Sequence, residues 1–115
     1  MNLIDSETLG GLKEMLGEDL YGITGLYVDT LPGEIQSVLE CYGQGDMPRL
    51  CKLAHGLKGS SANMGASEMA RLAAVIEKQA LAGDTAAVEA AIKELPLAAE
   101  ATVAAFKDGG FLGED

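Results

Sequence analysis

One side chain in this sequence stands out as a nucleophile, the imidazole of His55. It is the only histidine among the 115 residues. A neutral imidazole is a nucleophile near pH 7, and a phosphoryl group is one electrophile that it can accept. Counted from Leu50 at about 100° per residue, His55 lies about 140° around its predicted helix, almost opposite the large apolar side chains. We therefore expect the ring to face solvent.

The residues around His55 are basic, although the chain as a whole is acidic. Eighteen Asp and Glu against eight Lys and Arg give a net charge of −10. Between residues 47 and 67 there is no acid, whereas Arg49, Lys52 and Lys58 all lie there. Lys52 and Lys58 are three residues before and after His55, within side-chain reach on a helix. These cations favour the neutral ring, and Lys58 could stabilise a phosphoryl group bound to it.

Small residues share the exposed face with His55. Gly59 and Ala62 fall at about 180° and 120° around the helix, and Gly56 lies nearby at about 240°. Glycine inside a helix costs about 1 kcal/mol relative to alanine, so these positions indicate that another molecule approaches the backbone closely. The expected docking surface around the histidine comprises Arg49, Lys52, Gly56, Gly59 and Ala62.

Other classes of site fit the sequence less well. A ferritin-like metal site needs Glu-x-x-His, but the residue three before His55 is Lys52. The chain has no calcium loop of the D-x-[DN]-x-[DN]-G type, and its one Asp-Ser pair, Asp5-Ser6, lacks the leucine that follows the modified serine of acyl carriers. The alternative left open is a non-catalytic helical interaction protein whose surface histidine is incidental.

The composition and periodicity predict an all-α protein. Aromatic residues make up only 4% of the chain, and apolar residues recur with the helical period. Gly-rich or Asp-containing breaks divide the chain into helices expected over residues 6–16, 19–42, 47–64, 68–82 and 85–107. Pro32 and Pro96 are expected to kink or split their helices. Short connections predict an antiparallel up-down four-helix bundle preceded by a short N-terminal helix.

The domain is expected to span residues 1–108, followed by a Gly-rich, acidic tail over 109–115. That tail is predicted to be loose, although Phe111 and Leu112 could dock. In the helix over residues 19–42 the expected core stripe is Leu20, Ile23, Tyr27, Leu31, Ile35, Val38 and Tyr42.

Charge and cysteine content restrict the partners and the compartment. A net charge of −10 disfavours nucleic acid and anionic membranes. The two cysteines, Cys41 and Cys51, are too few for a structural zinc site and are expected to be free thiols. The N-terminus lacks the features of a signal peptide, and no apolar run is long enough to span a bilayer. The sequence favours a cytoplasmic protein.

The stretch Ala54-His55-Gly56-Leu57-Lys58-Gly59-Ser60-Ser61-Ala62-Asn63-Met64-Gly65-Ala66 resembles the histidine-containing phosphotransfer (HPt) domains of multistep two-component phosphorelays. It matches the pattern A-H-x-L-K-G-S-S-x-x-x-G-A at every fixed position. Downstream, Leu72, Ile76-Glu77 and Gly83-Asp84 resemble the next helix and turn of that family.

The resemblance implies that His55 takes a phosphoryl group from a receiver-domain aspartate and passes it to another. Lys58 would steady the group, and Gly59 would leave room for the receiver. The expected partners are receiver domains of a hybrid sensor kinase and a response regulator. The sequence has no nucleotide-binding loop, so we expect a monomeric phosphoryl carrier rather than an enzyme. No metal or cofactor of its own is expected, and Mg²⁺ would come with the receiver.

Overall fold

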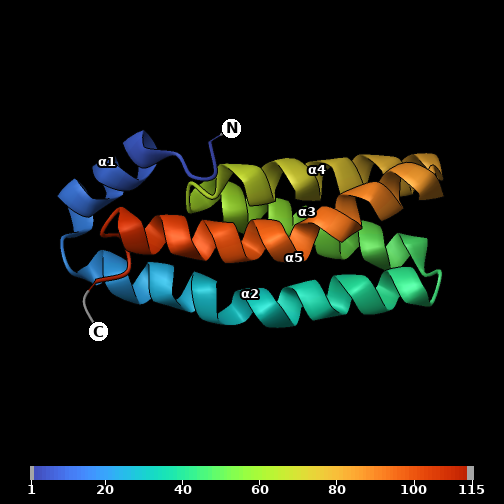
Figure 1. Cartoon of the computed structure of the whole chain (residues 1–115), viewed down its shortest axis with the longest axis horizontal. Coiled ribbons are helices and arrows are strands. Elements are labelled where there is room, and N and C mark those ends of the chain that lie inside the picture. The colour runs from blue at the N-terminus through green and yellow to red at the C-terminus, as the bar shows by residue number, and fades with distance from the viewer. Residues whose placement is uncertain (1, 114–115) are drawn as a thin grey trace.

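The computed structural model describes residues 2–113 and is built from helices throughout that range (Figure 1). The helices are α1 (Ser6–Leu16), α2 (Asp19–Gly43), α3 (Met47–Asn63), α4 (Ser67–Ala82) and α5 (Thr85–Asp108). The predicted all-α fold is confirmed, and each helix begins and ends within one residue of its expected bounds.

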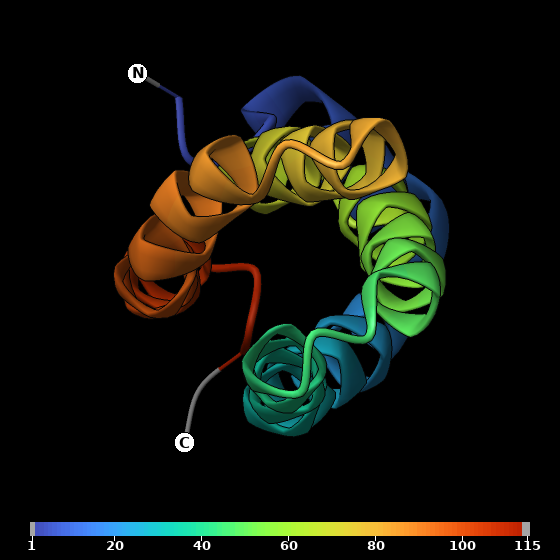
Figure 2. The ribbon, with the colours of Figure 1, turned by 90° about the vertical axis from the view of Figure 1, so that its right-hand side faces the viewer.

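Helices α2 to α5 form the predicted up-down bundle. Seen along the length of the bundle, successive helices lie side by side around a common core (Figure 2). Helix α1 lies at one end of the bundle (Figure 1). Helix α3 packs between α2 and α4. The largest fully buried side chains come from every helix, with Leu9, Leu20, Leu31, Leu50, Leu57, Leu72, Ile76, Leu95 and Phe106 among them. Burying such side chains is the main favourable contribution to folding.

Local signals set the ends of α3. The Asp46 carboxylate accepts a hydrogen bond from the backbone N–H of Arg49, and Pro48 occupies the first turn, where its missing N–H costs nothing. At the other end Gly65 has φ of +68°, a conformation that favours glycine. There the Asp5 N–H donates to the Gly65 carbonyl at 2.7 Å, so the N-terminal segment packs on the α3–α4 turn.

A buried polar pair holds α3 against α2. The Tyr27 hydroxyl lies 2.7 Å from Ser61 Oγ, and both residues are buried. The Tyr27 ring also makes an edge contact with Phe106 of α5, with ring centroids 6.0 Å apart. Because one side chain contacts both α3 and α5, the orientation of α3 in the bundle is well defined.

The two prolines do not split their helices. Helix α2 continues through Pro32 and α5 through Pro96. Each proline removes one backbone hydrogen bond, which a long helix packed on its neighbours tolerates. Helix α5 visibly changes direction along its length in Figure 1.

Three details differ from the sequence-based expectations. Ile23, expected in the core, is 45% exposed, and Thr24 is buried in its place. The reason is the C-terminal segment: Phe111 is buried, and the Thr24 hydroxyl donates to its carbonyl at 2.6 Å. The tail thus docks as far as Gly113, and residues 114 and 115 lie outside the described residues. Helix α4 begins at Ser67, one residue earlier than expected, after Ala66 as an N-cap that forms no side-chain hydrogen bond.

Two further expectations, free cysteines and the absence of a membrane-spanning helix, agree with the described residues. Cys41 and Cys51 are both free. Within residues 2–113, no helix is long and apolar enough to cross a bilayer.

Candidate functional site

His55 lies midway along α3 on the face that points away from the core. Its side chain is 69% exposed, whereas Leu50, Ala54, Leu57 and Ser61 of the same helix are buried. The predicted orientation toward solvent is therefore confirmed. A ring on a packed helix has a fixed direction, which a ring on a loop would lack.

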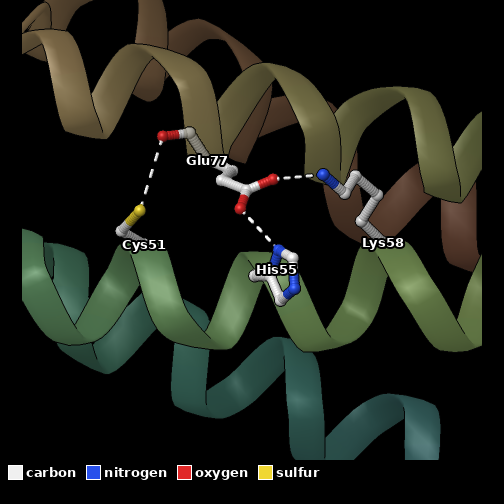
Figure 3. A network of polar contacts seen from close by, with 4 residues as sticks. All are labelled: Cys51, His55, Lys58 and Glu77. Carbon is white, nitrogen blue, oxygen red and sulfur yellow. Dashed lines mark hydrogen bonds and ion pairs between the residues drawn. The ribbon is translucent and has the colours of Figure 1, made fainter.

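A carboxylate from the neighbouring helix orients the His55 ring. Oε2 of Glu77, on α4, lies 2.6 Å from Nδ1 of His55 (Figure 3). An ionised carboxylate can only accept a hydrogen bond, so Nδ1 carries the proton and donates. In the neutral ring the second nitrogen, Nε2, then has the free electron pair. The contact thereby distinguishes the two ring nitrogens.

Lys58 binds the other oxygen of the same carboxylate. Its ammonium lies 2.6 Å from Oε1 of Glu77. The hydrogen bond from Lys58, and then the one from His55, hold the pKa of the Glu77 carboxyl below its ordinary value. Glu77 is therefore charged at neutral pH and joins the histidine to the lysine.

This carboxylate changes the electrostatic picture expected from α3 alone. The sequence predicted a histidine surrounded by cations, but the side chain nearest Nδ1 is an acid. Lys58 also contacts that acid rather than the ring. His55, Glu77 and Lys58 form a hydrogen-bonded triad in which the carboxylate offsets the charge of the lysine. We call it the HEK triad.

The packing of α4 explains why Glu77 reaches the histidine. Helix α4 buries Met69, Leu72, Ala73, Ile76 and Ala80. Glu77 follows Ile76 by about 100° around the helix, which places it beside the buried stripe. There its side chain is 22% exposed and points toward α3. The Cys51 thiol, one turn before His55, lies 3.7 Å from the Glu77 backbone carbonyl and contacts α4 at the same level (Figure 3).

The other predicted site residues lie on the exposed side of α3, at different distances from the ring. Lys52, Gly59, Ala62 and Arg49 are exposed, as is Gly56. A Cβ added at Gly56 or Gly59 would meet nothing within 4 Å, so neither glycine is required by packing inside the chain. Arg49 lies in the first turn, about 9 Å along the axis from His55, and is the most remote of the set.

Two further residues of the motif have structural roles. Ser60 Oγ donates to the Leu57 carbonyl at 3.2 Å, and Ser61 pairs with Tyr27. Both serines therefore serve helix geometry and packing rather than the chemistry of the site.

Glu77 is the residue that the sequence analysis did not place in the site. Its only signal was its position in the helix that resembles the family, beside Ile76. Within residues 2–113, no three of the His, Cys, Asp and Glu side chains gather where they could bind a metal ion. Both Glu77 oxygens are already bound by His55 and Lys58.

Comparison with models of known protein families shows which family the chain belongs to. The model of the Hpt domain matches residues 22–105, which include all of α3 and α4 and most of α2 and α5. The chain therefore belongs to the Hpt domain family. Such domains carry phosphoryl groups on histidine in phosphorelays, interact with receiver domains and have no kinase activity of their own. No curated protein and no solved structure matched the chain.

Proposed function

We propose that this protein carries a phosphoryl group on Nε2 of His55, between the receiver domain of a hybrid sensor kinase and that of a response regulator. The observation that supports this most strongly is the exposed ring whose Nδ1 is held by Glu77, because that contact leaves Nε2 free and directed by the helix. Family membership supports the class of reaction.

With the proton on Nδ1, the attacking atom in the transfer step is Nε2. The Nε2 electron pair attacks the phosphorus of an aspartyl phosphate on the donor receiver. The N–P bond forms as the P–O bond breaks, and the aspartate leaves as a carboxylate with the electron pair. No proton has to leave His55, because Nε2 carries none. The reverse step, with a second aspartate as nucleophile, unloads the histidine.

Glu77 acts as a positioning residue in this scheme. Attack through Nε2 places positive charge on the ring while Nδ1 keeps its proton. The Glu77 carboxylate, 2.6 Å from Nδ1, stabilises that charge as it develops. It also prevents the ring from rotating, so that Nε2 keeps its direction toward solvent.

Lys58 has two roles in the proposal. Before transfer it helps to keep Glu77 ionised through their 2.6 Å contact. After transfer its side chain, 38% exposed and one turn from His55, is free enough to reach the phosphoryl oxygens. The phosphoryl group brings nearly two negative charges, which compete with Glu77 for the lysine.

The proposed docking surface is the exposed side of α3 around His55. Gly56, Gly59 and Ala62 offer little steric obstruction to an incoming receiver, and Lys52 and Arg49 provide positive charge near its acidic phosphorylation site. We propose a monomeric carrier, as inferred from the sequence. We also retain the inference that the protein is cytoplasmic, which the free thiols support. Any Mg²⁺ would come with the receiver, whose chemistry requires it.

The test is transfer from purified receiver domains labelled on aspartate with radioactive acetyl phosphate. We expect the wild-type protein to acquire an acid-labile label, and His55→Gln to acquire none. Circular dichroism of the variant shows whether the bundle is retained. A label that persists in His55→Gln would exclude His55 as the carrier.

The same experiment evaluates the alternative of an interaction protein with an incidental histidine. In that case receivers would bind wild type and His55→Gln equally, and neither protein would be labelled.

A further inference from the structure

A groove separates α2 from α3 next to His55, with a volume of about 580 Å³. On the α3 side it is lined by Lys52, Gly56 and Ser60, and on the α2 side by Asp29, Gly33 and Glu34. Leu53 and Leu57 contribute its apolar lining. Gly56 directly follows His55 on α3, and Lys52 lies about one turn before it. The groove, hereafter the α2–α3 groove, is therefore continuous with the exposed face of the histidine.

The two sides of the groove carry opposite charges that do not pair with each other. Within the described part of the chain, the ion pairs shorter than 4 Å involve His55, Lys58 and Arg71 as the cations. Lys52 therefore forms no such pair with Asp29 or Glu34 across the groove. Partial burial raises the pKa of the Glu34 carboxyl, so its charged form is incompletely hydrated and would gain from a nearby cation.

The receiver has to cover more of this protein than one imidazole. A specific protein interface buries about 800 Å² on each partner, whereas transfer only requires an aspartate next to Nε2. On the α4 side of His55 the surface is occupied by Glu77 and Lys58. The α2 side is hollow, and a Cβ built on Gly33 or Gly56 would meet nothing within 4 Å. An interface centred on His55 thus extends over the groove.

An exposed apolar side chain continues this surface along α2. Leu26 is 65% exposed, and it precedes Thr30 and Gly33 of the groove by four and seven residues. Residues at those spacings share one face of a helix. Leu26 is thus exposed on the same side as the groove, where a partner could bury it.

We propose that the α2–α3 groove determines which receivers this protein accepts. A cognate receiver places an apolar side chain between the two helices and a Lys or Arg opposite Asp29 and Glu34. Receivers with an acidic residue at that position are repelled by the two carboxylates. Complementary charge at the edge of an interface mainly raises the association rate, and like charge excludes wrong partners. This inference rests on the proposed function.

The test compares two double variants with the same change in net charge. Asp29→Lys with Glu34→Lys reverses the acidic side of the groove. Glu14→Lys with Glu100→Lys is the control, because both are exposed glutamates outside the groove, on α1 and α5. Each protein receives phosphoryl groups from a panel of purified receiver domains, and the best donor to the wild type is used for kinetics. Labelling of His55 by phosphoramidate, which needs no docking, normalises each rate.

We expect the groove variant to lose on the order of tenfold in normalised kcat/KM relative to the control, mainly through KM. Reversing the facing Lys or Arg of the receiver to Glu should restore transfer to that variant. Equal rates for the groove variant and the control, whether both normal or both reduced, would overturn the inference.

Failure of the proposed function gives a different result. If neither phosphoramidate nor any receiver labels the wild type, the role of His55 is wrong. If the wild type is labelled and the groove variant transfers as well as the control, only the role of the groove is wrong.

Discussion

Two of the side-chain hydrogen bonds that α3 makes to its neighbours have opposite surroundings. Ser61 lies 2.7 Å from the Tyr27 hydroxyl of α2 inside the core, where both residues are buried. His55 lies 2.6 Å from the Glu77 carboxylate of α4 at the surface, with its ring 69% exposed. The distances are almost equal, but the energetic consequences are not.

The two hydrogen bonds differ in energetic consequence because water can replace one of them when it is broken and cannot replace the other. A buried hydroxyl that loses its partner has no water to bind, so the cost falls on the stability of the fold. The His55 ring, 69% exposed, is hydrated at once when its bond breaks, so that bond contributes little to stability. Its effect is on which nitrogen of His55 holds the proton. One contact thus holds the helix in place, and the other determines which nitrogen of His55 has the free electron pair.

Among the residues around His55, loss of the Glu77 carboxylate should have the largest effect on transfer. In Glu77→Ala the ring loses both its orientation and its counter-charge, and we expect transfer to slow by about tenfold to a hundredfold. Glu77→Gln keeps an acceptor for Nδ1–H but not the charge, so its rate should be intermediate. Quench-flow transfer and the ¹⁵N shifts of the imidazole measure rate and tautomer separately.

The control for Glu77 is Glu100→Ala, which removes an exposed acid outside the HEK triad. The thermal unfolding midpoints of all three variants should stay close to wild type, because ion pairs near the surface contribute little to stability. A wild-type transfer rate in Glu77→Ala would show that this carboxylate does not position His55.

Tyr27→Phe should affect stability instead of transfer. The change removes the hydroxyl and leaves Ser61 Oγ buried and unpaired, which costs about 1–3 kcal/mol in the free energy of unfolding. Urea denaturation measures this, with Tyr21→Phe, a half-exposed position on the same helix, as the control. A loss of transfer without a loss of stability would contradict the assigned division between the two contacts.

Lys58→Ala should have a smaller effect than Glu77→Ala. Its partly exposed ammonium is worth at most about 1 kcal/mol, or on the order of fivefold, in the rate of transfer or the half-life of the phosphohistidine. Lys93→Ala on α5 is the control. Unchanged rate and half-life would mean that the charge of Lys58 does not matter to the phosphoryl group.

The buried contact should also respond to alkaline pH. Burial raises the pKa of Tyr27 from its ordinary value of 10.0 to about 12, although the bond to Ser61 opposes this. A raised pKa in the folded state means that stability is complete below pH about 10 and falls as the pH rises toward 12. The free energy of unfolding should decline more steeply in wild type than in Tyr27→Phe over that range. Parallel curves would exclude the titration of Tyr27 as the cause.

Much of the fold could be predicted because its signals are local. Asp46, Gly65 and the apolar spacing of α3 are sufficient to place the helix and to direct His55 outward, since caps and periodicity act within one or two turns. The same reasoning was wrong for Ile23, because burial of the neighbouring Thr24 depends on Phe111, which lies 87 residues away in the chain.

The candidate site was only partly predictable for the same reason. His55 and Lys58 share a helix, so their proximity follows from their spacing. Glu77 is 22 residues from His55, and its contact depends on the relative shift and rotation of α3 and α4. Helix periodicity carries no information about that register. The sequence therefore predicted the cations around His55 but missed Glu77, the acid that contacts the ring.

The most direct test of the account is to identify the phosphorylated atom by NMR. Protein labelled with ¹⁵N on histidine would be phosphorylated by a receiver and examined by imidazole ¹⁵N correlation and ¹⁵N–³¹P coupling. We predict a phosphoryl group on Nε2 of His55, with Nδ1 still protonated. A phosphoryl group on Nδ1, or on any residue other than His55, would contradict the account.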